Sequence, residues 1–74
     1  MNKERRKEIL SVAEELQTCV GTLETIKDAE DEARENLPEN FQSGDRYSES
    51  EECSDILSDA VDTLTEMIGN LENI

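Results

Sequence analysis

Leu37-Pro38-Glu39-Asn40-Phe41-Gln42-Ser43-Gly44-Asp45-Arg46-Tyr47 is the stretch that decides the fold, because a helical pattern enters it from each side. Proline has a fixed φ, lacks a backbone N–H and disfavours the α conformation in the residue before it. A helix that arrives from the N-terminal side is therefore expected to end near Asn36. We predict a connector over 37–48 between helices over 9–36 and 49–72, with a basic N-terminal extension over 1–8.

The segment before the connector has apolar residues at alternating steps of three and four, which is typical of one face of a helix. Ala13 and Val20 widen this face to that of a bundle helix. The repeating positions are Ile9, Val12, Leu16, Cys19, Leu23 and Ile26, followed after a break at Glu30 by Ala33 and Leu37.

The segment after the connector repeats the pattern. Ser48 and Glu51 form an S-x-x-E capping box, which predicts that the second helix begins near Glu49. The apolar positions are Cys53, Leu57, Ala60, Leu64, Met67, Leu71 and Ile74, flanked by Ile56, Val61 and Ile68.

These patterns predict an all-α protein, an antiparallel two-helix hairpin. In a lone hairpin Ala13, Val20, Val61 and Ile68 would be exposed, and large exposed apolar patches are unusual in stable monomers. We therefore expect a homodimer that forms a four-helix bundle. The residues expected to mediate self-association are Leu16, Val20, Leu23, Leu57, Val61, Leu64 and Ile68.

Cys19 and Cys53 lack the spacing of a redox or zinc motif. In a hairpin they lie about 20 Å apart along the axis, which is too far for a disulfide. We expect both to be buried, reduced thiols.

The composition limits the classes of function. The chain of 74 residues has a net charge of −13, with no histidine and no tryptophan. Such acidity disfavours direct binding of nucleic acid. The chain has no apolar run as long as a membrane span and no signal-peptide pattern, so we expect a cytoplasmic protein. No cofactor and no metal is predicted.

Carboxylates form rows on the polar side of each predicted helix. Neighbours in a row are about 5–6 Å apart, which approaches the phosphate spacing of nucleic acid. A DNA-mimicking surface is one interpretation, and an ordinary solvated face is the other. The row on the second helix comprises Glu52, Asp55, Asp59, Asp62 and Glu66, and that on the first comprises Glu24, Asp28, Asp31 and Glu35.

The connector has two interpretations. Leu37, Phe41 and Tyr47 are expected to fold back and cover the end of the bundle. Alternatively, the connector binds a small anionic nucleotide, with Arg46 as an anion contact and Tyr47 as a stacking surface. The candidate contacts for such a ligand are Arg34, Phe41, Arg46 and Tyr47.

A catalytic alternative is weaker. Glu32, Glu35, Glu52 and Asp55 would meet across the connector, and their spacing loosely resembles the metal-binding helices of all-α nucleotide pyrophosphohydrolases. However, Asp31 stands where that pattern has Glu, and most of these carboxylates are expected to face solvent. We therefore predict a protein that is not an enzyme.

The run Lys27 to Arg46, with its motif Asn36-Leu37-Pro38-Glu39-Asn40-Phe41-Gln42, resembles a group of short acidic proteins encoded by phages and prophages of Gram-positive and gut bacteria. The resemblance extends over about residues 5 to 72, and Gly44 departs from it. It implies a helical hairpin of phage origin without an assigned chemistry.

We therefore expect a phage-encoded protein that binds and inhibits a host protein, such as a defence or nucleic-acid-handling component, through its acidic surface. Sequestration of a small nucleotide is the alternative. A structural or assembly role, with close contacts at Gly21 and Gly69, is the third possibility.

Overall fold

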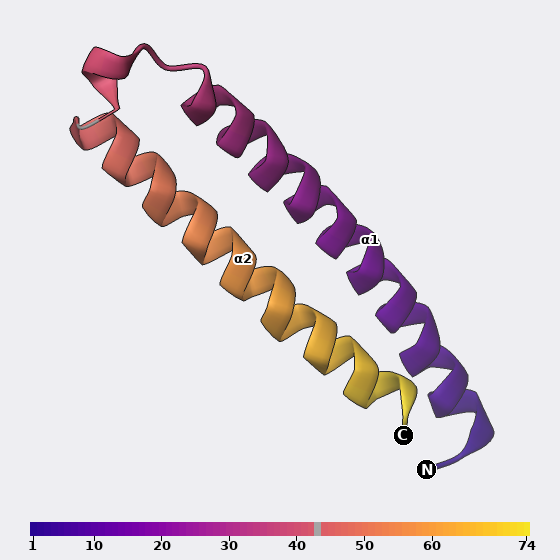
Figure 1. Ribbon diagram of the computed structural model, residues 1–74. Coiled ribbons are helices and arrows are strands. Elements are labelled where there is room, and N and C mark those ends of the chain that lie inside the picture. Colours follow the sequence, from indigo (N-terminus) through magenta and orange to yellow (C-terminus); the bar gives the residue numbers. More distant parts are fainter. Residues whose placement is uncertain (43) are drawn as a thin grey trace.

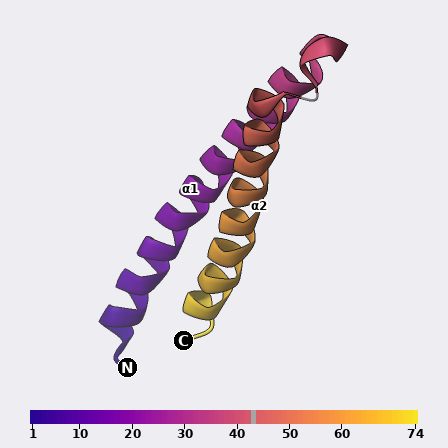
Figure 2. The ribbon, with the colours of Figure 1, turned by 90° about the vertical axis from the view of Figure 1, so that its left-hand side faces the viewer.

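The computed structural model describes residues 1–42 and 44–74 as an antiparallel helical hairpin (Figure 1). Helix α1 spans Lys3–Glu35, a short 3₁₀ helix η1 spans Glu39–Phe41, and helix α2 spans Asp45–Glu72. The two long helices lie side by side in both views, with the chain termini at one end and the turn at the other (Figures 1 and 2). The predicted all-α hairpin is confirmed. Ser43, within the predicted connector, lies outside the described residues.

Helix α1 begins at Lys3, so the predicted basic extension is helical almost throughout. The early start has a local cause, because the Asn2 side chain accepts a hydrogen bond from the Arg5 N–H at 2.8 Å. This N-cap pairs one of the N–H groups that a helix leaves free at its start. At the other end Pro38 has no N–H that could donate to the Arg34 carbonyl. The Leu37 N–H donates to that carbonyl instead, at 3.2 Å. The predicted end near Asn36 is confirmed.

Helix α2 begins at Asp45 rather than near Glu49. Gly44 is its N-cap in an extended conformation, and the Ser48 N–H already donates to the Gly44 carbonyl at 3.2 Å. The predicted capping box therefore lies inside the helix and does not mark its start. The turn before it is held by backbone bonds of η1, including Phe41 N–H to the Pro38 carbonyl at 2.9 Å.

The core is a seam between the two helices. Ala13, Val20 and Ile68 are its fully buried apolar residues. The residues predicted to join two copies lie along this seam within one chain: Val20 and Ile68 are buried, and Leu16, Leu23, Leu57, Val61 and Leu64 are half-buried. The prediction that Ala13, Val20, Val61 and Ile68 are exposed in a lone hairpin is wrong.

Other apolar residues are exposed instead. Val12 is 49% exposed and Ile26 51%, and on α2 Ile56 is 60% and Met67 53% exposed. Cys19 and Cys53 are also exposed, so the prediction of buried thiols is wrong. The cause is a rotation of each helix about its axis. One inward column lies one residue further round than the sequence pattern suggests, with Val20 in place of Cys19, while the column of Leu16 and Leu23 stays in the seam. The centre of the contact therefore turns by about 50°, half the angle between successive residues.

The hairpin is a thin rod of 59 × 14 × 12 Å between Cα atoms. Its radius of gyration is 17.1 Å, against about 11 Å for a compact chain of this length. Its accessible surface is 5840 Å², against about 4,600 Å² for a compact monomer of this mass. In the described residues, neither long helix contains an apolar stretch that could cross a membrane.

Candidate functional site

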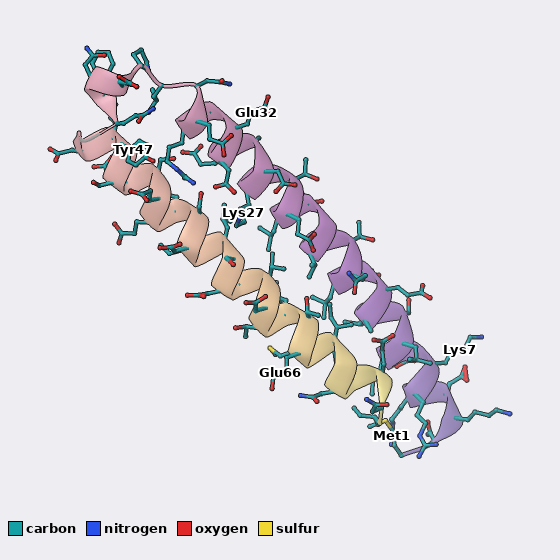
Figure 3. The ribbon with its side chains drawn as sticks, viewed as in Figure 1. Met1, Lys7, Lys27, Glu32, Tyr47 and Glu66 are labelled. Carbon is teal, nitrogen blue, oxygen red and sulfur yellow. The ribbon has the colours of Figure 1, made fainter. Side chains whose placement is uncertain are left out.

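A cluster of polar side chains joins the helices near the turn. We call it the polar junction, and it comprises Lys27, Asp31 and Arg34 of α1 with Ser50 and Ser54 of α2. The Asp31 carboxylate accepts hydrogen bonds from Lys27 Nζ at 2.8 Å, Arg34 Nη2 at 2.9 Å and Ser54 Oγ at 2.6 Å. The Lys27 side chain lies between the helices, whereas Lys7, Glu32 and Glu66 project from the outer sides of the rod (Figure 3).

Arg34 completes the junction. Its Nη1 donates to Ser54 Oγ at 2.9 Å and to Ser50 Oγ at 3.2 Å. Its guanidinium carbon also lies 6.0 Å from the centre of the Tyr47 ring, within reach of a cation–π interaction. Ser50 and Ser54 are buried, and every buried side-chain N and O atom of the described residues has a hydrogen-bond partner. The junction is therefore fully satisfied within the hairpin.

The junction shifts the protonation equilibria of its charged members. Hydrogen bonds from Lys27 and Ser54 hold the pKa of Asp31 well below its ordinary value, against the opposing effect of desolvation. The hydrogen bond to Asp31 raises the pKa of Lys27. Desolvation is the largest single effect on Arg34 and lowers its pKa, but the hydrogen bond from Arg34 to Asp31 and the nearby negative charges together outweigh it and raise the pKa of that guanidinium. All three groups are charged at neutral pH.

The junction corrects two interpretations of the sequence. Asp31 is not a member of an outward acidic row, because it faces Ser54 across the seam. Arg34 is committed to Ser50, Ser54 and Asp31, so its proposed role as a ligand contact would require these bonds to break. Ser50 and Ser54 were not predicted as site residues, although their four-residue spacing continues the inward side of α2.

The turn carries a separate apolar pocket of about 410 Å³, lined by Leu37, Pro38, Phe41, Gly44, Asp45 and Arg46. Phe41 is 57% exposed and does not cover the end of the hairpin as predicted, whereas Leu37 and Tyr47 are half-buried. The four predicted loop contacts thus divide into two groups: Phe41 and Arg46 line the pocket, and Arg34 and Tyr47 contact each other beside the seam.

The acidic row of α2 is exposed along its whole length. Its members are Glu52, Asp55, Asp59, Asp62 and Glu66. They span about 21 Å at 1.5 Å per residue. Two ion pairs form in the described part of the chain, Lys27–Asp31 and Arg34–Asp31, and neither involves this row. The row therefore presents charge that no lysine or arginine of the described residues neutralises at close range.

A set of apolar residues and a set of acidic residues lie on two opposite sides of the hairpin. The inward columns are Ala13, Val20, Lys27 and Arg34 on α1 and Ser54, Val61 and Ile68 on α2, each with a seven-residue spacing. The residue just before an inward position and the residue just after it lie about 100° to either side. Because the helices are antiparallel, the same rotation from the seam leads to the same side of the hairpin on both helices.

The residues just before the inward positions form the apolar face: Val12, Cys19, Ile26 and Ala33 of α1, and Cys53, Ala60 and Met67 of α2. The residues just after them form the acidic face: Glu14, Asp28 and Glu35 of α1, and Asp55 and Asp62 of α2. Gly21 and Gly69 complete the columns of the acidic face, and an added Cβ at either glycine would meet nothing within 4 Å. Val12, Ile26 and Met67 are therefore exposed on the side opposite to Asp28 and Asp62, whereas the exposed Leu10 and Ile56 belong to neither set of columns.

The carboxylates considered for a catalytic site, Glu32, Glu35, Glu52 and Asp55, are all exposed. No group of three or more Asp, Glu, Cys or His side chains within residues 1–42 and 44–74 is placed to hold a metal ion. Comparison of the chain with protein-family models, with curated proteins and with solved structures gave no match.

Proposed function

We propose that the hairpin is a non-enzymatic binding protein that uses its acidic surface to engage a protein with a basic surface. The single observation that carries the proposal is the acidic row of α2, whose carboxylates are exposed and lie outside the ion pairs. A rigid helix holds these charges at fixed intervals, so the row matches a linear basic groove better than a diffuse charge would. In line with the sequence resemblance, we propose a phage origin, a cytoplasmic location in the bacterial host and a host protein as the partner.

The surrounding structure supports this use of the row. Binding through an exposed row needs no rearrangement of the seam, because the core residues and the polar junction lie between the helices. The acidic face lies opposite the apolar face, and the acidic row of α2 shares Asp55 and Asp62 with the acidic face. Long-range attraction between such a surface and a basic groove raises association rates and weakens with added salt.

The test compares two variants of equal charge in affinity capture from host lysate, followed by titration of the captured protein. The first variant neutralises the row with Glu52→Gln, Asp55→Asn, Asp59→Asn and Asp62→Asn. The matched control carries Glu4→Gln, Glu8→Gln, Glu15→Gln and Glu72→Gln, which lie elsewhere on exposed surface. We expect the first variant to lose at least tenfold in affinity and the control to bind like the wild type. Equal binding by the two variants contradicts the proposal.

We also propose that the hairpin is a homodimer, a four-helix bundle of two copies. The excess of accessible surface over that of a compact monomer supports this, as does the exposure of Val12, Ile26 and Met67. The residues of the seam are no longer the ones expected at the interface, since they are occupied within one chain. Sedimentation equilibrium that gives the mass of a single chain at every concentration would contradict the dimer.

Sequestration of a small anionic nucleotide is the second candidate function, and the turn pocket favours it. Phe41 offers a surface for stacking and Arg46 a positive charge, both at the pocket wall. Asp45 in the same wall opposes an anion. Titration of nucleotides against wild type and Arg46→Ala tests it, and we would abandon this candidate if the variant bound as tightly as the wild type.

A further inference from the structure

We propose that a second copy of this chain covers the apolar face and that the two copies lie head to tail, with the turn of each beside the chain termini of the other. The inference rests on the homodimer proposed above and adds the face and the orientation. Three observations support it: the size of the face, the sizes of the side chains along it, and the distribution of charge between the two ends of the rod.

The size of the apolar face suits a second copy. The face extends from Val12 to Ala33, about 32 Å at 1.5 Å per residue, along the middle of a rod that measures 59 Å by 14 Å between Cα atoms. Two rods packed along their whole outline would cover about 800 Å² on each copy, which is the area that stable protein dimers bury per partner. A partner seated on only part of the face would leave other apolar residues in water, whereas a second rod of the same length covers all of it.

The side chains of the apolar face are complementary in size only in one orientation. Head-to-tail packing by a two-fold axis across the rod places α1 against the partner's α1, and α2 against the partner's α2. With the axis midway between Cys19 and Ile26, each small residue of α1 faces a large one. Cys19 then meets the partner's Ile26, and Ala33 meets the partner's Val12.

The same axis also pairs the residues of α2. Asp31 and Ser54 are hydrogen-bonded and so lie at the same level of the hairpin. The midpoint of Cys19 and Ile26 lies about 8.5 residues from Asp31, and the midpoint of Ala60 and Met67 lies about 9.5 residues from Ser54. The two midpoints are therefore at nearly the same height along the hairpin, about 1.5 Å apart. Ala60 therefore meets the partner's Met67, again a small residue against a large one, as close packing requires.

Head-to-head packing does not give this match. It places α1 of one copy against the partner's α2 at the same level. Ala33 would then meet the partner's Cys53 near the turn, two small residues together. Val12 would lie near the C-terminal end of the partner's α2, where the side chains are larger. The side chains between the two copies would then be too small to fill the space at one end of the bundle and larger at the other end.

The charges favour the same orientation. Four of the seven basic residues, Lys3, Arg5, Arg6 and Lys7, lie at the open end of the rod. The turn end is acidic on both helices. Head-to-tail packing brings each basic end beside the partner's acidic turn end, whereas head-to-head packing brings like charges together at both ends, which is destabilising.

The experiment uses disulfide formation in the full chain. Cys19→Ser and Cys53→Ser remove the native thiols, and Val12→Cys and Ala33→Cys are added. Positions 12 and 33 of one chain are about 32 Å apart along the helix, far beyond disulfide reach, so a 12–33 linkage can form only between copies. The matched control carries Ser11→Cys and Glu32→Cys in the same background, one residue earlier and on the outer side of α1.

After oxidation, we expect a covalent dimer in which mass spectrometry of peptides finds the 12–33 linkage, with at least a tenfold lower yield for the control. A dimer linked 12–12 or 33–33 would overturn the head-to-tail orientation and leave the homodimer standing. A dimer in sedimentation that gives no linkage above the control would overturn the choice of the apolar face. A monomer at every concentration would overturn the homodimer as well.

Discussion

Ser54→Ala is the change that tests the polar junction most sharply. Ser54 is 5% exposed, and its hydroxyl donates to Asp31 at 2.6 Å while accepting from Arg34 at 2.9 Å. A hydrogen bond to a charged partner contributes about 1.5–3 kcal/mol. Both partners keep some access to water, with side-chain exposures of 27% for Asp31 and 16% for Arg34. Water can therefore replace part of the lost hydrogen bonding, and the free-energy cost of losing both bonds stays near about 1.5 kcal/mol.

Helix propensity acts in the opposite direction, because alanine is better than serine in a helix interior by about 0.5 kcal/mol. We therefore expect Ser54→Ala to lower the free energy of unfolding by about 1–2 kcal/mol. For a chain of this size each kcal/mol corresponds to about 4–8 °C in Tm. Urea and thermal unfolding followed by circular dichroism at one fixed protein concentration measure both quantities.

Ser58→Ala is the matched control. Ser58 lies one turn further along α2, is half-buried, and has no side-chain hydrogen bond to the described residues. Ser58→Ala gains the same helix propensity and loses no side-chain hydrogen bond, so it should be as stable as the wild type or slightly more stable. If Ser54→Ala were as stable as Ser58→Ala, the junction would contribute nothing to the fold and the reasoning would be refuted.

Three further predictions follow from the seam, the junction and the apolar face. Ile68→Ala removes a buried side chain and should cost about 2–4 kcal/mol in urea unfolding, whereas Ser11→Ala on the outer surface should change stability by less than about 0.5 kcal/mol; equal costs would contradict the position of the seam. The folded-state pKa of Asp31 is lowered from 3.8, so its stabilisation is complete above that value and is lost as the pH falls through the folded pKa. The stability gap between wild type and Asp31→Asn should therefore be full at pH 7 and shrink in acid below about pH 4, and a gap that is constant with pH would show that Asp31 is not stabilised in its charged form. Val12→Glu should weaken dimerisation at least tenfold in sedimentation equilibrium while Ser11→Glu does not, and equal dissociation constants would show that the apolar face is not the interface.

The sequence predicted the helices and the turn because these depend on local signals. The steps of three and four identify amphipathic helices regardless of their partner, and Pro38 ends α1 through its missing N–H. The ends of the helices were predicted less well. Asn2 and Gly44 act as N-caps, but the apolar pattern begins several residues later, so both starts were placed too late.

The rotation of the helices could not be predicted from apolar residues alone. Counting apolar residues puts Cys19 and Ile26 at the centre of the contact, yet the seam follows the column that contains Val20 and Lys27. This column can lie inward because its polar members find partners there: Arg34 donates to Ser54 across the seam, and Lys27 donates to Asp31 of its own helix. An arginine looks like a surface residue until the serines that accept its hydrogen bonds are known.

This rotation also decides which residues remain free for other molecules. Had the seam followed Cys19 and Ile26, these residues would lie between the helices, and Val20 and Ile68 would be exposed in their place. In the observed hairpin Cys19 and Ile26 are exposed on one side and Asp28 and Asp62 on the other. A dimer through the apolar face leaves the acidic faces of both copies outward, available to a basic partner.

Native mass spectrometry of the intact protein, over roughly a hundredfold range of concentration, tests this account most directly. The chain has a mass of 8.4 kDa, and the account predicts a dimer of twice that mass in the wild type, with a shift to monomer for Val12→Glu and none for Ser11→Glu. A wild type that remains a monomer throughout, or a dimer that Val12→Glu leaves intact, would contradict the claim that a second copy covers the apolar face.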